Sequence, residues 1–356
     1  MITVVVGGQY GGEGKGKISA YLALKEKAEI ACRCGGPNSS HTVVWKGKVH
    51  RLRMMPTAAA VNKDIEVYFG PGTLIHVRTL FSEIKALGHQ GRVRIDKRAG
   101  VVTDEIVAQQ RGDERYKKLG STLTGTGYAS AMRCLRSLRL AGEFDELRPL
   151  VCDLTPHLME AVAGRRHIIV EGHQGYGLSS YHGDYPYVSS RDSTAASMLA
   201  ELGLGPTLRT LRVVLVAKMF PTRNHGGSLG AEIPLAEADK LGIREFGGGS
   251  WGIPDRRRRV GYIDVALLRN SAFANGATQV ALTGADYFDR DLRLRTKFAD
   301  LSRDLLEIIH GLNSQVAAPV RLVSTGPDTE ATIEVPRQGK ITDVRDVSGE
   351  PVPGLN

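Results

Sequence analysis

The stretch TVVVGGQYGGEGKGKIS, residues 3–19, decides the fold class because it predicts a strand, a glycine-rich loop and a helix in that order. Residues 3–6 are β-branched and short enough to form a buried strand, and six glycines lie between Gly7 and Gly16. A helical pattern begins near Ile18. Backbone N–H groups of such a loop, together with the helix N-terminus, can bind a phosphate. The alternative is a glycine-rich turn without a ligand, but glycine this dense is costly unless something approaches the backbone.

The loop is a variant of the usual phosphate-binding motif. Gly11, Gly16 and Lys17 fit the spacing G-x-x-x-x-G-K, whereas Ile18 stands where the usual P-loop has a Ser or Thr whose hydroxyl meets magnesium. We expect Lys15 and Lys17 to reach back to phosphate oxygens.

Composition indicates an ordinary soluble enzyme with anionic partners. The 356 residues are 42% hydrophobic and 24% charged, with a formal charge of +9 and a pI near 9.4. Nucleotides, a dicarboxylate and nucleic acid all fit this charge. Met1 leads directly into the first strand and no apolar run reaches about 18 residues, so we expect no signal peptide, no membrane partner and a cytoplasmic location. The cysteines lack C-x-x-C spacing and are expected to be reduced and structural; they are Cys32, Cys34, Cys134 and Cys152.

Strand and helix patterns alternate along the chain, which predicts one α/β domain over residues 1–356 with a central, mostly parallel sheet. Further strands are expected near residues 29–33, 65–69, 93–95, 167–170, 211–217, 280–282 and 320–323. Helices are expected near residues 18–28, 74–87 and 129–140, and from residue 195. Loops rich in Gly, Thr and charge follow the strands, where open α/β sheets bind their ligands.

Basic segments leave two interpretations open. Arg133, Arg136 and Arg139 are spaced along one flank of a predicted helix, and residues 256–259 are four consecutive arginines. Arginines suit a dicarboxylate because the guanidinium binds carboxylates with two prongs. They would also suit a basic protein that binds nucleic acid, although no nucleic-acid motif accompanies them.

The segments GGQYGGEGKGK, NSSHT, EGHQG, YPYVSS, RRRRVGY and STGPD, in this order, resemble the adenylosuccinate synthetase family over nearly the whole chain. The resemblance implies a C–N bond-forming ligase that uses a nucleoside triphosphate to phosphorylate O6 of IMP and then lets the amine of L-aspartate displace the phosphate. A purine 6-oxo group is a poor leaving group until it is phosphorylated. Both steps develop charge that magnesium and fixed cations stabilise.

Three departures point to one branch of this family. The family's loop reads G-D-E-G-K-G-K, and the resemblance implies that its Asp takes the N1 proton of IMP and binds magnesium; here Gly12 stands at that position. SSRD, residues 189–192, replaces T-S-S-N and resembles the phage-encoded 2-amino-2′-deoxyadenylosuccinate synthases, which act on dGMP in making 2-aminoadenine DNA. The chain is also shorter after Arg136 and after Asp286, as in that branch.

These departures predict that L-aspartate is joined to C6 of dGMP through a 6-phosphoryl intermediate, to give N6-succino-2-amino-2′-deoxyadenylate, in a host cytoplasm if the chain is phage-encoded. The alternative is an ordinary synthetase that uses IMP and GTP. Asp286 matches a residue that reads the donor's base, but the Lys two residues before it has become Gly284. ATP or dATP is therefore favoured as donor, with GTP open.

The resemblance implies catalytic roles for Lys15, His41 and Gln174. The implied donor contacts are Gly11, Gly12, Glu13, Gly14, Lys15, Gly16, Lys17, Ser40, His41, Thr42, Asp286, Ser324, Thr325, Gly326 and Pro327. The implied dGMP contacts are Gly12, Asn38, Ser121, Thr122, Arg136, Gln174, Ser189, Arg223 and Asn224. Aspartate would meet Gly249, Ser250, Arg256 and Arg258, and Mg²⁺ would lie at Gly12 and Ser40. Arg136 matches an arginine that reaches the neighbouring subunit's site, which implies a homodimer.

Overall fold

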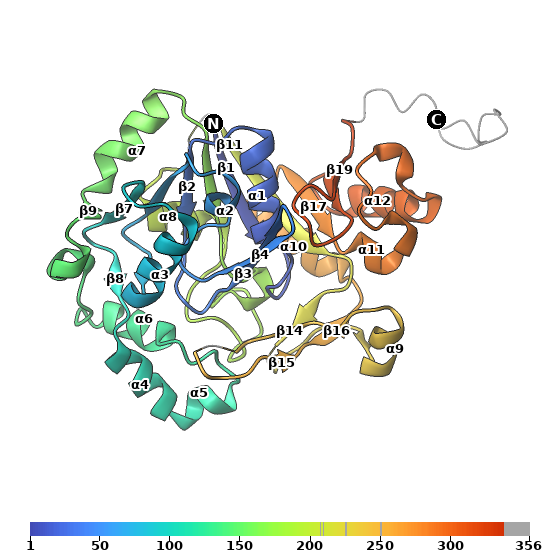
Figure 1. Ribbon diagram of the computed structural model, residues 1–356. Helices are drawn as coiled ribbons and strands as arrows, with labels where there is room; N and C mark the ends of the chain where they lie inside the picture. Colours follow the sequence, from blue (N-terminus) through green and yellow to red (C-terminus); the bar gives the residue numbers. More distant parts are fainter. Residues whose placement is uncertain (207, 209, 225, 250, 338–356) are drawn as a thin grey trace.

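The computed structural model describes residues 1–206, 208, 210–224, 226–249 and 251–337 (Figure 1). Its centre is a ten-stranded sheet in which all neighbouring strands are parallel except β18 and β19. Across the sheet the strands are β19 (Thr332–Glu334), β18 (Val320–Ser324), β17 (Gln279–Thr283), β11 (Leu211–Lys218), β1 (Ile2–Gly7), β10 (Ile168–Glu171), β2 (Ile30–Arg33), β5 (Glu66–Phe69), β7 (Val93–Asp96) and β9 (Val151–Cys152). The prediction of an α/β domain with a mostly parallel sheet is confirmed.

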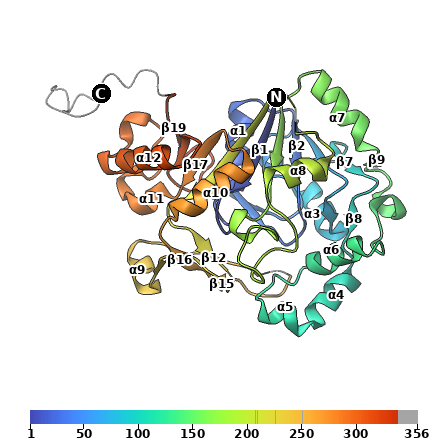
Figure 2. The same ribbon diagram turned by 180° about the vertical axis from the view of Figure 1, so that it is seen from behind.

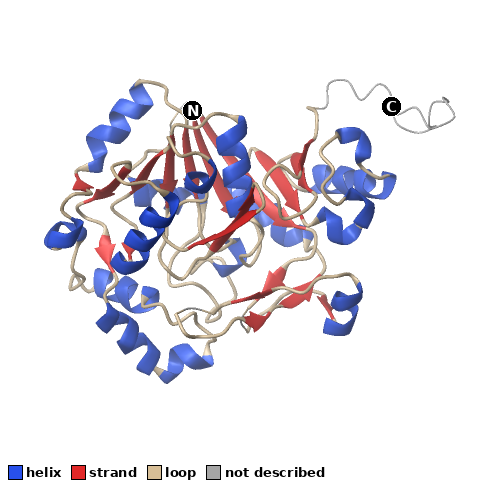
Figure 3. Ribbon diagram, in the orientation of Figure 1, coloured by secondary structure: helices blue, strands red, loops and turns tan. Residues whose placement is uncertain are grey.

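Helices cover both faces of this sheet, because alternate strand side chains point to opposite sides. Val5 of β1 belongs to one core, with Ile18 and Leu80, whereas Val4 belongs to the other, with Leu268. The first core takes α1 (Lys15–Lys25), α2 (Ala58–Val61) and α3 (Val77–Leu87). The second takes α7 (Leu154–Ala163), α8 (Ala195–Leu202), α10 (Val265–Asn275) and α12 (Arg303–Gln315). Figures 2 and 3 show the two layers from behind and by element type.

Smaller elements surround the carboxyl edge of the sheet, below it in Figure 1. The remaining helices are α4 (Asp104–Gly112), α5 (Glu114–Lys118), α6 (Thr126–Cys134), α9 (Leu235–Lys240) and α11 (Ala285–Phe288), with 3-10 turns at Ala141–Glu143, Asp145–Leu147, Tyr176–Leu178, Arg290–Leu292 and Phe298–Asp300. Short strands pair as β3 (His41–Trp45) with β4 (Lys48–Leu52), β6 (Leu74–Ile75) with β8 (Gly100–Val101), β16 (Arg259–Gly261) with β12 (Thr222–Arg223) and β13 (Glu232–Ile233), and β14 (Phe246–Gly247) with β15 (Arg256–Arg257). The loops after β1, β2, β10 and β11 therefore meet at one edge.

Several predicted boundaries are wrong. Helix α1 begins at Lys15 rather than near Ile18, and Leu74–Ile75 forms strand β6 before helix α3 begins. Helix α6 ends at Cys134, because Arg136 adopts a left-handed φ of 63° and the N–H of Ser137 bonds the Met132 carbonyl. This helix ending usually requires glycine, so the sequence carried no signal for it.

Two further expectations concern charge and cysteine. Because α6 ends early, Arg133, Arg136 and Arg139 do not form one helical stripe, and the nucleic-acid interpretation loses that support. All four cysteines are free; Cys32 and Cys34 are buried, whereas Cys134 is exposed. Within the described ranges, no helix is long and apolar enough to cross a membrane.

Candidate active site

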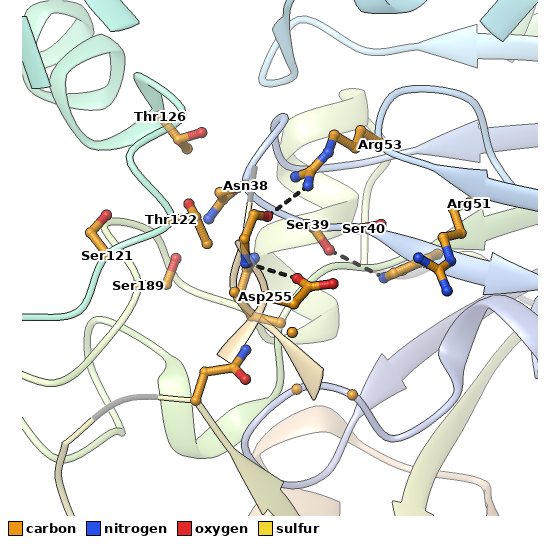
Figure 4. Close-up of a pocket in the computed structure, with 18 of the residues that line it drawn as sticks. Asn38, Ser39, Ser40, Arg51, Arg53, Ser121, Thr122, Thr126, Ser189 and Asp255 are labelled. Carbon is orange, nitrogen blue, oxygen red and sulfur yellow. Dashed lines mark hydrogen bonds between the residues drawn. The ribbon is translucent and has the colours of Figure 1, made fainter. Parts of the chain in front are cut away.

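A cleft of about 1520 Å³ lies at the carboxyl edge of the sheet and brings most of the predicted site residues together (Figure 4). The predicted residues that line it are Gly11, Gly12, Gly14, Lys15, Gly16, Asn38, Ser40, His41, Thr42, Ser121, Thr122, Gln174, Ser189, Asn224, Gly249 and Arg258. The glycine loop, residues 38–42 and Gln174 follow the neighbouring strands β1, β2 and β10, as parallel topology favours, and the other residues come from loops outside the sheet.

The glycine loop is held closed by its own carboxylate. Gly11, Gly12 and Gly14 adopt left-handed φ values of 80°, 70° and 95°. The buried Glu13 accepts hydrogen bonds from the backbone N–H groups of Gln9 (3.1 Å) and Gly11 (2.8 Å). Lys15 donates from Nζ to Glu13 Oε2 at 2.6 Å and to the carbonyl of Gln174. The ammonium of Lys15 is thus fixed at the wall of the cleft, while Glu13 lies beneath it.

Lys17 differs from expectation, because its side chain turns away from the glycine loop. Its Nζ donates three hydrogen bonds of 2.6 Å, to Ser324 Oγ and to the carbonyls of Gly326 and Ala331. Burial lowers the pKa of this ammonium to about 7. Lys17 therefore joins helix α1 to the loop after β18, rather than reaching into the cleft.

His41 is the first residue of β3 and lies in a buried network. Its Nδ1 is 2.6 Å from Glu171 Oε1, which also accepts a 2.9 Å hydrogen bond from Arg33 Nη1. Arg33 Nη1 is also 2.6 Å from Nδ1, so an acceptor and a donor both face this nitrogen, while Nε2 lies 3.2 Å from Ser39 Oγ. Burial, and then the Arg33 guanidinium, lower the pKa of His41 to about 3. His41 is neutral in this arrangement and lies between the Glu171 carboxylate and the Arg33 guanidinium.

The predicted nucleotide contacts gather at one side of the cleft, where Asn38, Ser121, Thr122 and Ser189 lie close together in Figure 4. Gln110 donates to Ser121 Oγ at 3.0 Å. By contrast, Ser189 Oγ, Asn224 Oδ1 and Arg258 Nε are buried atoms without a partner in the protein. Buried polar atoms are rarely left unpaired, so these three indicate a polar ligand.

Gly12 and Arg258 lie in direct apposition. A Cβ on Gly12 would be 1.8 Å from Nη1 of Arg258 and 3.5 Å from Thr222 Oγ1. The guanidinium thus fills the space that a side chain at residue 12 would need.

Only one of the four consecutive arginines, Arg258, lines the cleft, and it lies between strands β15 and β16. Arg258 points inward, whereas Arg257 pairs with Asp239 at 2.7 Å and Arg259 pairs with Glu232. Arg256 is exposed and is not part of the cleft wall. Of the two arginines predicted to meet aspartate, Arg258 thus lines the cleft and Arg256 does not, and their binding of aspartate stays a prediction.

Other predicted residues also lie away from the cleft. Arg223 is buried and donates to the carbonyls of Tyr187 (2.7 Å) and Ser228, so it supports the surrounding loops. Arg136 is exposed at the end of α6. The donor residues that do not line the cleft are Glu13, Lys17, Asp286, Ser324, Thr325, Gly326 and Pro327, and Ser250 lies outside the described residues.

Asp286 and the 324–327 segment nonetheless lie near one another, around Lys17. The pKa of Asp286 is raised by burial, and the nearby Lys17 ammonium offsets only part of that rise. The 324–327 segment is joined to Lys17 by the hydrogen bonds described above.

Sequence reasoning missed several residues at the site. Glu171 and Arg33 end neighbouring strands, and Glu171 stands in the quoted EGHQG segment, so its strand-end position was an available signal. Glu245 lines the cleft and pairs with Lys218. Arg53 joins two cleft loops by donating to the carbonyls of Pro37 (3.1 Å) and Gly249 (2.8 Å). No local pattern marks Glu245 or Arg53.

The cleft fits a magnesium ion only if the nucleotide supplies most ligands. Among the described residues, no group of three or more His, Cys, Asp or Glu side chains could hold a metal. Near the glycine loop the protein offers the Ser40 hydroxyl and backbone carbonyls, because Gly12 and Ile18 lack ligand atoms in their side chains. Mg²⁺ commonly takes phosphates and waters as its remaining ligands.

Comparison with known proteins agrees with this geometry. The adenylosuccinate synthetase family model matches residues 4–143 and 138–295. Adenylosuccinate synthetase from Methanococcus aeolicus is 38% identical over 338 residues, which cover 94% of this chain and 99% of the relative. The Methanocaldococcus jannaschii enzyme is 39% identical, covering 94% and 96%.

Two solved structures are similar to this one. Fully ligated adenylosuccinate synthetase from Plasmodium falciparum superposes with a TM-score of 0.84 at 20% identity, covering 94% of this chain and 99% of that one, which shows the shared fold. The cyanophage S-2L succinoaminodeoxyadenylate synthetase, bound to dGMP and to dATP as an energy donor, has a TM-score of 0.78 at 28% identity, covering 94% and 95%. The chain belongs to the adenylosuccinate synthetase family and is a C–N bond-forming ligase of that type.

Proposed function

We propose that this enzyme joins L-aspartate to C6 of dGMP, with ATP or dATP as the phosphoryl donor. In the first step O6 of the purine attacks the γ-phosphorus, the N1 proton passes to a donor phosphate oxygen or a water, and the nucleoside diphosphate leaves. In the second the aspartate amine attacks C6, and O6 leaves with the phosphate. The product is N6-succino-2-amino-2′-deoxyadenylate.

The observation that carries the choice of dGMP is Gly12. A carboxylate at this position of the loop would lie beside N1 of the base, which neighbours C2, where guanine carries an amino group and hypoxanthine only hydrogen. Gly12 removes that carboxylate from the edge of the base, and the adjacent side chain is the guanidinium of Arg258. The SSRD segment and the likeness to the cyanophage enzyme bound to dGMP and dATP support the same choice.

The remaining roles are proposed from the family resemblance, and the contacts in the cleft support them. Lys15 and His41 would contact the transferring phosphoryl group. Glu171 would stabilise the His41 ring when that ring is charged. Asn38, Ser121, Thr122, Ser189 and Asn224 would bind the nucleotide, and Arg258 would bind a carboxylate of aspartate. Magnesium, which the family uses, would neutralise charge on the donor phosphates. Lys17 would hold the 324–327 segment in place for the donor's base.

Ordinary IMP- and GTP-dependent synthesis is the second candidate. The archaeal relatives at 38–39% identity bear the name adenylosuccinate synthetase, whereas identity to the cyanophage enzyme is 28%. Those relatives match this chain over nearly their whole length, so the short chain does not distinguish the two candidates.

One assay separates these functions. IMP, GMP and dGMP are each incubated with L-aspartate and with ATP, dATP or GTP, and kcat/KM is measured for every pair. A preference for dGMP with ATP or dATP is expected. A preference for IMP with GTP would replace the proposal with the second candidate.

We also propose a homodimer in which Arg136 reaches the neighbouring site, since Arg136 is exposed just beyond α6. Sedimentation equilibrium should give twice the chain mass, and Arg136→Ala should weaken nucleotide binding. A monomeric active enzyme would exclude this arrangement.

A further inference from the structure

His173 connects Gln174 to a buried ion pair formed by Glu201 and Arg191. Its imidazole is fully buried, with Nδ1 2.5 Å from Gln174 Oε1 and Nε2 3.3 Å from Glu201 Oε1. Gln174 lines the cleft, whereas His173 and Glu201 lie behind it. The imidazole therefore links the buried Glu201 carboxylate to the Gln174 side chain in the cleft.

The far side of the imidazole is anchored by charge. Glu201 lies 2.8 Å from Arg191 Nη2 and accepts a 2.8 Å hydrogen bond from the Gly35 N–H. Burial alone would raise the pKa of Glu201, but Arg191, His173 and the Gly35 N–H hold it below its ordinary value. Arg191 also donates to the carbonyls of Gly35 (3.1 Å) and Gly72. Arg191 is the arginine of SSRD, so this departure from the family pattern is tied to Gln174 through two side chains.

Packing leaves the imidazole no freedom. Gly35 has a φ of 89°, and a Cβ there would be 2.6 Å from His173 Cδ2, so the ring packs directly against the backbone of the loop before Asn38. Gln174 itself has a left-handed φ of 42°, and its carbonyl accepts from Lys15 Nζ. A non-glycine residue in this conformation persists only where its surroundings hold it. Both the main chain and the side chain of Gln174 are thus restrained.

We propose that His173 is a positioning residue that sets the orientation of the Gln174 amide. Both ring nitrogens face oxygen acceptors, Nδ1 the amide oxygen of Gln174 and Nε2 the carboxylate of Glu201. This orientation of the amide therefore needs a hydrogen on each nitrogen, with His173 donating to Gln174 Oε1 and to Glu201 Oε1. The NH₂ group is then the end of the amide that remains for the cleft, where it can donate to O6 of the purine. Without His173 the amide could turn its oxygen toward O6, which would be repulsive. The inference rests on the proposed chemistry at C6 but not on the choice between dGMP and IMP.

A double-mutant cycle tests this. With the purine nucleotide that the wild type prefers, His173→Ala should lower kcat about 10- to 100-fold, as loss of one aimed donor does, and change the KM for aspartate less than about twofold. In a Gln174→Ala background the same substitution should cause no further loss, because its effect passes through Gln174. Wild-type kcat in His173→Ala, or losses that multiply in the double variant, would overturn the proposal.

Two controls separate positioning from folding. His89 is another fully buried histidine, bonded to the Leu87 carbonyl and outside the cleft, so His89→Ala matches the loss of a buried ring. The kcat of His89→Ala should stay within about twofold of wild type even if its Tm falls as much as the Tm of His173→Ala. Imidazole in the buffer should restore part of the activity of His173→Ala but none to His173→Ala/Gln174→Ala. A kcat loss in His89→Ala equal to that in His173→Ala would overturn the proposal.

A readout without turnover keeps the proposal independent of the substrate. With ¹⁵N-glutamine labelling, the side-chain amide of Gln174 should give one ordered pair of resonances in the wild type and an averaged pair in His173→Ala. Identical amide signals in the two proteins would contradict the proposal even if no nucleotide were turned over. Failure of the C6 chemistry would appear separately, as absence of product with every nucleotide in the wild type.

Discussion

The guanidinium of Arg258 occupies the space in which a side chain on Gly12 would begin, with Nη1 1.8 Å from the Cβ position of the glycine. Gly12, which stands where the family has a carboxylate, thus lies directly beside Arg258, which is proposed to bind a carboxylate of aspartate. A longer residue at position 12 must displace the far end of a flexible side chain, which is possible, and must also adopt a φ of 70°, which costs roughly 1 kcal/mol.

Gly12→Asp should shift the ratio of kcat/KM from dGMP toward IMP by about tenfold or more, because the new carboxylate would stand beside N1 and C2 of the base. Gly12→Ala is the matched control, since it carries the same backbone cost and the same Cβ but no charge. An unchanged ratio in Gly12→Asp, or an equal shift in Gly12→Ala, would show that the carboxylate does not select the base.

Lys15→Ala and His41→Ala should each lower kcat by roughly 100- to 1000-fold or more, because each removes a side chain proposed to contact the phosphoryl group during its transfer. Lys25→Ala, an exposed lysine of the same helix, should keep normal kcat. Circular dichroism would check that the folds match. Normal turnover in either variant would move the phosphoryl site elsewhere.

Arg258→Ala should raise the KM for aspartate about 10- to 100-fold, as loss of hydrogen bonds to a charged group does, with a much smaller effect on the KM for the nucleotide. Arg257→Ala removes a neighbouring guanidinium that pairs with Asp239 outside the cleft, so its KM for aspartate should be unchanged. Arg256 and Arg258 are the two arginines predicted to bind aspartate. We expect Arg256→Ala to raise the KM for aspartate less than Arg258→Ala does. Equal effects on both substrates would instead indicate a general electrostatic role for Arg258.

Lys17→Met should raise the KM for the donor about tenfold and lower the free energy of unfolding by about 2–4 kcal/mol, because Ser324 Oγ and two buried carbonyls lose their donor. Lys25→Met, on the same helix but exposed, serves as control. Urea unfolding and donor titration measure the two effects. A large stability loss with an unchanged donor KM would leave Lys17 a purely structural residue.

His41 should contribute to acid sensitivity. Its folded pKa of about 3 lies below the unfolded value of about 6.5, so the unfolded chain binds more protons between these values and stability falls as pH falls through that window. The loss should approach about 1.4 kcal/mol per pH unit below 6. In His41→Asn this part of the pH dependence should disappear, as urea unfolding at pH 7, 6 and 5 would show. Parallel curves for the two proteins would contradict the assignment.

Much of the fold was determined by residues 3–19 and by the strand patterns that follow. β-branched runs and glycine loops have short-range periodicities, so the parallel sheet and the position of the ligand edge were predictable. The same holds for the cleft residues from the glycine loop and the Asn38–Thr42 segment, because strand ends in a parallel sheet share one edge. Helix boundaries were less accurate, since Arg136 rather than a glycine ends α6.

The tertiary structure alone decided which charged side chains face the cleft. Folding turns Arg258 inward and pairs Arg257 and Arg259 with Asp239 and Glu232, acids 18 and 27 residues away in sequence. Lys17 leaves the phosphate loop because three acceptors from residues 324–331 surround its ammonium. The contacts of His41 with Glu171, and of Gln174 with His173, Glu201 and Arg191, depend on side-chain packing in three dimensions. Sequence spacing carries no information about such contacts, because the energy of a buried charge is set by the partners that folding brings to it.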